Sequence, residues 1–273
     1  TFMKAKLLIA GAVLAFFISF NMGNPLLKES SAPFGAPQFD KISDEHYLPA
    51  FEAAIAEGKA EIDAIVENQE EPTFENTIEA MEYAGQTLNT VAGIFYNLME
   101  ANTNDQMQAV AEQVSPMLTE YSMYVSLNEK LFERVKAVYE KRNELGLDQD
   151  QMTLLEDNYK GFVRGGANLS EEDKALYSKW SEELSLATLQ FSKNVLAATN
   201  AYTLHVTDSA DLAGLPEYVK TMGAETAKEK NLEGWAFTLA YPSFSPFMKY
   251  SQNRELRRQM WTAYNSKSIG GEF

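Results

Sequence analysis

The chain has 273 residues, of which 45% are hydrophobic and 23% charged, a balance typical of a folded protein with a substantial core. Its 39 acidic and 23 basic side chains give a net charge of -16, which argues against a nucleic-acid or anionic-membrane surface, because phosphate binding draws its affinity from Lys and Arg. Cysteine is absent, which excludes disulfides, thiol nucleophiles and thiolate zinc sites.

Residues 1–23 are predicted to be a signal peptide. Lys4 and Lys6 follow the probable start, Met3, and precede an apolar run over 7–20 that is short for a membrane span. We therefore expect an exported, periplasmic protein without stable membrane association after cleavage. The cleavage site is poorly defined, and an uncleaved anchor is the alternative.

Residues 24–42 contain three prolines and little periodicity, which predicts an extended arm on the surface of a domain. The apolar residues Phe34, Phe39 and Ile42 indicate that this arm packs against another part of the protein.

Residues 43–199 are expected to form a helical domain, a multi-helix bundle or array. Apolar residues recur at helical spacing behind successive start signals, and the short connections favour antiparallel neighbours. The expected caps are Ser43, Thr73, Thr103 with Gln106, Asn128, Asp148 with Gln151, and Ser170 with Asp173. One helix is expected over 74–100, another is expected to kink or restart at Pro116, and the helix after Asn128 is expected to stop at Gly146.

In residues 200–273 the period changes. Apolar and polar residues alternate from Tyr202 to Val206 and from Trp235 to Tyr241, which predicts a small antiparallel β-hairpin attached to the helical body. A short helix is expected to start at Leu215-Pro216, and another, capped by Asn253, should end the segment. We expect this segment to be loosely ordered alone, with aromatic residues such as Trp235, Phe237 and Trp261 in an exposed patch.

The sequence contains no catalytic motif. His46 and His205 are isolated, and their surroundings favour a first-turn polar residue and a strand residue over metal ligands. The acidic groups 70–71, 171–173 and 182–183 are most simply solvated helix surfaces and helix N-terminal charges. No catalytic, cofactor-binding or metal-binding residue is therefore assigned in this chain.

Several segments resemble one known family in the right order. They are Asn24-Pro25-Leu26-Leu27, 33–42, 46–52, 72–78, and the late group 234–242, 246–248 and 253–257 with Tyr264. Together they look like the start of bacterial peptidyl-dipeptidases of the thimet oligopeptidase-like zinc metallopeptidase family.

The resemblance implies the N-terminal half of a channel-forming zincin fold that admits short, unstructured peptides, in an enzyme expected to be a monomer. In the family one zinc is held by the two His of a His-Glu-x-x-His helix and a further Glu. None of these can be placed on this chain, so the resemblance implies a fragment that is inactive as given, with zinc only in the parent protein. On this interpretation residues 200–273 lead into the missing catalytic domain. The alternative is an exported, non-enzymatic helical peptide-binding or scaffold module.

Overall fold

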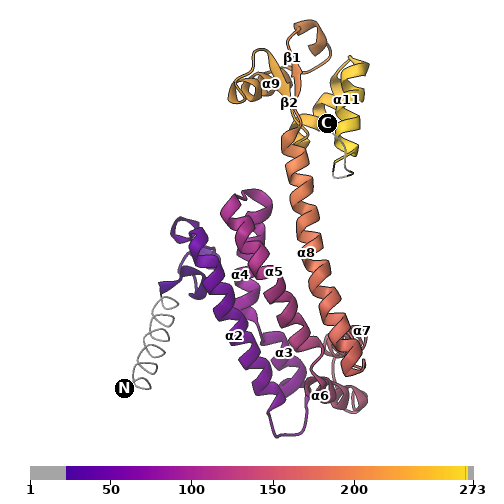
Figure 1. The fold of residues 1–273 in the computed structure, drawn as a ribbon. Helices are drawn as coiled ribbons and strands as arrows, with labels where there is room; N and C mark the ends of the chain where they lie inside the picture. The colour runs from indigo at the N-terminus through magenta and orange to yellow at the C-terminus, as the bar shows by residue number, and fades with distance from the viewer. Residues whose placement is uncertain (1–22, 268, 270–273) are drawn as a thin grey trace, which may run out of the picture. The chain divides into compact units, whose positions relative to one another are not determined.

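The computed structural model describes residues 23–267 and 269, and helices dominate it, as predicted (Figure 1). The leader predicted over 1–23 lies outside the described residues except for Gly23. The chain packs as two units, residues 1–186 and 187–273, which we describe separately. In the part of the chain that the structure describes, no helix combines the length and apolar character needed to cross a membrane.

The first unit begins with four short 3₁₀ turns and continues with helices joined by short connections (Figure 1). Its elements are η1 (Pro25–Leu27), η2 (Pro33–Gly35), η3 (Phe39–Lys41), η4 (Asp44–His46), α2 (Tyr47–Val66), the π-helical η5 (Phe74–Glu79), α3 (Ala80–Tyr83), α4 (Gln86–Ala101), α5 (Asp105–Ser126), α6 (Glu129–Glu140), α7 (Gln149–Arg164) and the first half of α8 (Glu171–Ala201).

Most of the predicted caps are confirmed. Thr73 exchanges backbone and side-chain hydrogen bonds with Asn76, and Asp148 does the same with Gln151. The Asn128 side chain accepts from the Leu131 amide at 3.0 Å, and Ser170 accepts from the Asp173 amide at 3.2 Å. These local pairs satisfy amides that a helix start leaves without partners.

Four boundaries differ from the prediction. The cap of α5 is Asn104, whose side chain accepts from the Met107 amide at 2.8 Å, so the Thr103 assignment is wrong. The helix predicted over 74–100 is divided at Gly85, which has φ 75° and separates α3 from α4. Pro116 lies inside a continuous α5, so the helix does not restart there, and α6 ends at Glu140, before the turns that lead to Gly146.

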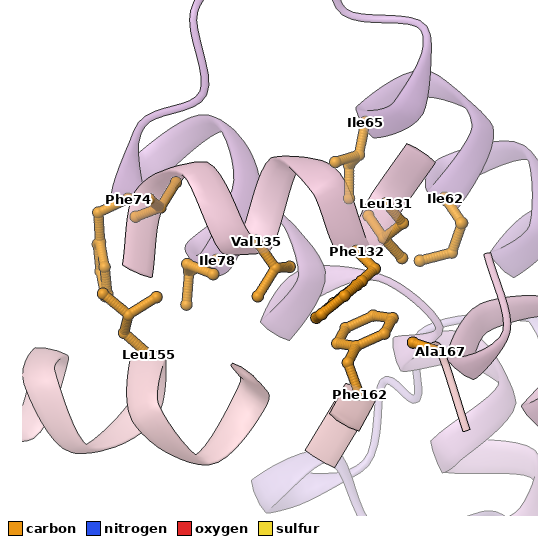
Figure 2. Close-up of a cluster of buried hydrophobic side chains, with 11 residues drawn as sticks. Ile62, Ile65, Phe74, Ile78, Leu131, Phe132, Val135, Leu155, Phe162 and Ala167 are labelled. Carbon is orange, nitrogen blue, oxygen red and sulfur yellow. The ribbon is translucent and has the colours of Figure 1, made fainter. Parts of the chain in front are cut away.

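One buried cluster joins α2, η5, α6 and α7 (Figure 2). The Phe132 and Phe162 rings stack with centroids 5.8 Å apart, and Ile78, Leu131 and Leu155 are fully buried. The members of the cluster are Ile62, Ile65, Phe74, Ile78, Leu131, Phe132, Val135, Val138, Leu155, Phe162 and Ala167. A second aromatic contact ties α2 to α4, where the Phe95 ring meets Tyr47 and Phe51 edge to face at 4.9 and 5.4 Å.

Arg134 of α6 closes the connection between α2 and η5. Its guanidinium donates to the carbonyls of Asn68 at 2.8 Å and Glu70 at 3.3 Å, and to the Asn76 side chain at 3.0 Å. A buried arginine is tolerated because these acceptors replace its water.

The second unit contains the end of α8 and two strands that pair antiparallel. Its other elements are β1 (Leu204–Val206), η6 (Ser209–Leu212), α9 (Glu217–Glu229), β2 (Trp235–Phe237), α10 (Tyr241–Tyr250) and α11 (Arg254–Asn265). Leu204 lies opposite Phe237, and Val206 lies opposite Trp235. The pairing is confirmed, but η6 and α9 lie between the strands, so the connection is not a tight hairpin.

The second unit has a hydrophobic core of its own. Phe237, Phe247 and Met260 are fully buried there, and the Phe244 and Tyr264 rings stack at 4.0 Å beside them. Of the aromatic residues predicted to lie in an exposed patch, Trp261 is exposed and Phe237 is not. The additional helix α10, which begins at Tyr241, supplies Phe247 and was not predicted.

Candidate functional site

A cleft of the first unit, with a volume of about 640 Å³, lies between the N-terminal arm, His46 at the end of η4, and helix α4. The arm contains three short 3₁₀ turns, and residues between and after them such as Lys28, Ala32 and Ile42 have extended backbone. The cleft is lined by polar and basic groups of the arm and by the helices beneath it, among them Lys28, Gln38, Lys41, His46, Thr90 and Ile94.

Asn24 and Leu26 fasten the arm to the helices. The Asn24 side chain donates to the His46 carbonyl at 2.8 Å and accepts from the Leu26 amide at 3.0 Å. Asn24 is 1% exposed and Leu26 4% exposed, whereas Phe34 is fully exposed. Of the three residues expected to pack the arm, Phe34 and Phe39 are exposed and Ile42 is half-buried, and the buried anchor lies at the first turn.

The polar groups of the cleft mostly hold its own walls. The Ser30 hydroxyl donates to the Ala36 carbonyl at 2.6 Å and accepts from the Ala32 amide at 3.2 Å. The Lys41 ammonium donates to the Gln38 side chain. Such contacts shape the turns of the arm.

Both histidines have local partners. The His46 Nδ1 accepts from the Ser43 amide at 3.0 Å at the start of η4. The His205 Nε2 donates to the Glu233 carbonyl at 2.6 Å from the exposed side of β1. These contacts assign the two rings to a helix start and to a strand edge, as their sequence positions suggest.

No three His, Cys, Asp or Glu side chains come together as a metal site anywhere in the described ranges 23–267 and 269. The acidic groups 70–71, 171–173 and 182–183 are exposed, and Glu171 lies 2.9 Å from the Lys174 ammonium. The described residues therefore do not fit a zinc ion.

Sequence reasoning missed the cleft and two polar residues that join distant segments, Asn24 beside the cleft and Arg134 at the connection between α2 and η5. Asn24 could have been found, because an Asn before Pro25 is a cap signal for a short helical turn. Arg134 gives no such signal, because its partners lie at least 58 residues away in the sequence.

The chain resembles known peptidases over most of its length. It is 38% identical over 241 residues to the dipeptidyl carboxypeptidase of Escherichia coli (strain K12), covering 88% of this chain and 35% of that protein. It is 31% identical over 247 residues to the oligopeptidase A of the same organism, covering 90% of this chain and 36% of that protein. The organellar oligopeptidase A of Arabidopsis thaliana is 28% identical over 256 residues, which cover 91% of this chain and 32% of the plant protein.

The chain thus spans about a third of the length of these curated relatives. The family described as the N-terminal domain of neurolysin and thimet oligopeptidase matches residues 51–174, which run from α2 into the first turn of α8. Over residues 51–174 the chain accordingly carries the N-terminal domain of the neurolysin and thimet oligopeptidase family.

Proposed function

We propose that this chain is the N-terminal part of a zinc-dependent peptidyl-dipeptidase or oligopeptidase that hydrolyses short, unstructured peptides. The observation that carries the proposal is the 38% identity to a dipeptidyl carboxypeptidase across 88% of the chain. The lower identity to oligopeptidase A, 31%, favours removal of C-terminal dipeptides over internal cleavage.

In this proposal the chain supplies part of the wall of a substrate channel, and the catalytic groups belong to a further part of the same protein. The described residues offer no zinc site, and their two histidines already serve η4 and β1. The acidic surface, with a net charge of -16, favours peptides that carry basic residues. We further propose that the protein is exported to the periplasm and acts there as a monomer.

The first test is the reading frame beyond Phe273 in the source genome. A His-Glu-x-x-His motif downstream supports the proposal, because residues one helical turn apart can hold one metal while the Glu acts as base. A frame that closes without such a motif would favour the non-enzymatic peptide-binding or scaffold module.

The second test compares the full-length protein encoded by the longer reading frame, here called the long product, with the 273-residue chain. The long product should release dipeptides from a peptide with a free C-terminus, lose activity with a chelator, and spare the C-terminally amidated peptide. The 273-residue chain should hold no stoichiometric zinc after dialysis and cleave neither peptide. One tightly bound zinc in the short chain, with turnover that a chelator abolishes, would contradict the division of roles.

A further inference from the structure

Helix α8 exposes a row of apolar side chains in the half that belongs to the first unit. Leu176, Trp180 and Leu184 recur every four residues, which places them on one face, and we call them the α8 stripe. Their exposed fractions are 40%, 60% and 68%. Lys174, in the first turn, is the only buried residue of α8, and it bonds Glu129 of α6 at 2.6 Å and Glu171 at 2.9 Å.

The polarity of α8 is inverted relative to an ordinary packed helix. Its contact with α5 is made by hydroxyls, with the Ser185 and Ser115 oxygens 2.5 Å apart. An amphipathic helix normally turns its apolar side toward its neighbour and its polar side toward water. In α8 the apolar side chains of Trp180 and Leu176 are exposed instead, which indicates that the apolar side has another partner.

A groove beside the stripe could bind that partner. It has a volume of about 370 Å³ and lies between α4, α5 and α8 of the first unit. Its apolar lining comes from Tyr96, Leu118, Met123 and Leu184. Hydroxyl groups come from Ser115, Thr119 and Ser122. Leu184 belongs both to the stripe and to the lining of the groove, so the two adjoin.

The family match and the length of the relatives indicate what covers this surface. The matched domain ends at residue 174, within the first turn of α8, and the chain spans only about a third of its relatives. The stripe therefore lies on the helix by which the chain leaves the family's N-terminal domain. A second copy fits poorly, because Glu183 lies three residues from Trp180 on the same side of α8, in a chain of net charge -16, and like charges oppose self-association.

We propose that the α8 stripe and its groove are the surface on which the remaining part of the full-length protein packs. That part should present an apolar centre fringed by basic side chains. This inference rests on the proposed function in one respect, that a longer protein exists, and concerns how its two parts are held together.

The absence of cysteine makes the surface directly testable by thiol labelling. Trp180→Cys and Leu176→Cys probe the stripe, and Leu176→Cys leaves the larger Trp180 in place. Glu182→Cys is the matched control, because it is exposed and lies two residues from Trp180, about 200° around the helix. Maleimide labelling of each variant is followed by peptide mass mapping, in the 273-residue chain and in the full-length protein.

In the 273-residue chain all three positions should label at similar rates. In the full-length protein positions 176 and 180 should label at least about tenfold more slowly while position 182 changes little, because a packed surface reacts only when it opens. Equal rates in the two proteins would overturn the proposal. Protection that appears in the short chain and grows with its concentration would also overturn it, by identifying a second copy as the occupant.

Peptide hydrolysis and metal content measured on the same full-length preparation separate this inference from the proposed function. An active, metal-containing protein with an unprotected stripe refutes the docking surface alone. An inactive protein with a protected stripe refutes the peptidase proposal and supports the docking surface.

Discussion

Arg134 donates to the side-chain oxygen of Asn76 at 3.0 Å across 58 residues of sequence. Asn76 accepts from the Thr73 amide at 2.8 Å with the same oxygen and donates to the Glu71 carbonyl at 2.9 Å. One asparagine thus joins the start of η5, the loop before it and helix α6. The predicted cap at Thr73 is in this way part of a wider polar network.

Replacing Arg134 should destabilise the first unit. Arg134→Met removes the donors to the Asn68 and Glu70 carbonyls and to Asn76, at a cost of about 1–3 kcal/mol. The Arg134 Nε is buried without a partner, which keeps the expected cost below that of a fully satisfied arginine. Urea unfolding measures the loss, with the exposed Lys136→Met as control, expected within about 0.5 kcal/mol of wild type. Equal midpoints for both variants would refute the role given to Arg134.

Two helical glycines should respond oppositely to alanine. A Cβ at Gly223 in α9 would lie 2.8 Å from the ring of the fully buried Phe237, so Gly223→Ala should cost about 1–3 kcal/mol through overpacking. A Cβ at Gly93 in α4 meets nothing within 4 Å, so Gly93→Ala should stabilise by about 0.5–1 kcal/mol. Thermal or urea unfolding of the pair decides, and a stabilising Gly223→Ala would show that the α9 contact with β2 is looser than described.

Tyr124 should give the first unit an alkaline transition. Its hydroxyl donates to Asp63, and this hydrogen bond, helped by burial, raises the pKa of Tyr124 from 10.0 to about 12. The folded state favours the protonated phenol, so the stabilisation is fully present below pH 10 and is lost as the pH rises toward 12. Tyr124→Phe should therefore differ from wild type in unfolding midpoint at pH 8 and converge with it near pH 12.

Phenolate absorbance reports the same group directly. Tyr124→Phe should lose one late-titrating tyrosine, whereas Asp63→Asn should keep the tyrosine and move its titration to lower pH. A late titration that survives intact in Asp63→Asn would show that the carboxylate is not its cause.

The second unit should protect its amides from exchange, because it has its own core. Slow exchange is expected in β2 and α11, where Phe237 and Met260 are fully buried. Met260→Ala should cost about 2–5 kcal/mol by leaving a cavity and should speed exchange there while sparing α4. Fast exchange across 235–265 in the wild-type chain would instead support the expectation of a loosely ordered segment.

Much of the fold could be predicted because helix starts are local. Thr73, Asn128, Asp148, Ser170 and Asn253 each bond an amide two to four residues away, and the sequence shows both partners. The division at Gly85 was missed because the fold decides it: the Glu61 carboxylate accepts from the Gly85 amide at 2.7 Å across 24 residues. Helix α10 was missed because the alternating pattern from Trp235 to Tyr241 predicted a strand up to the point where α10 begins, and Pro242 lies in its first turn, where proline is tolerated.

The candidate cleft and the α8 stripe needed the structure for the same reason. The apolar spacing of Leu176, Trp180 and Leu184 predicts a helix face but does not show whether anything covers it. The resemblance of Asn24-Pro25-Leu26-Leu27 to a peptidase family indicated a relationship, whereas the contact of Asn24 with His46 depends on how the arm folds back.

The anchoring of Asn24 bears on how an exported precursor could be trimmed. An α-amino group has a pKa of about 7.7–8.0 and is largely protonated at neutral pH, so it needs water or an acidic partner. A product that began at Asn24 would place this ammonium on a residue that is 1% exposed, whereas Gly23 lies in solvent. If the leader is removed, amino-terminal sequencing should find at least one residue ahead of Asn24. A cut directly before Asn24 should instead loosen the contact of the arm with His46 and open the cleft beneath the arm.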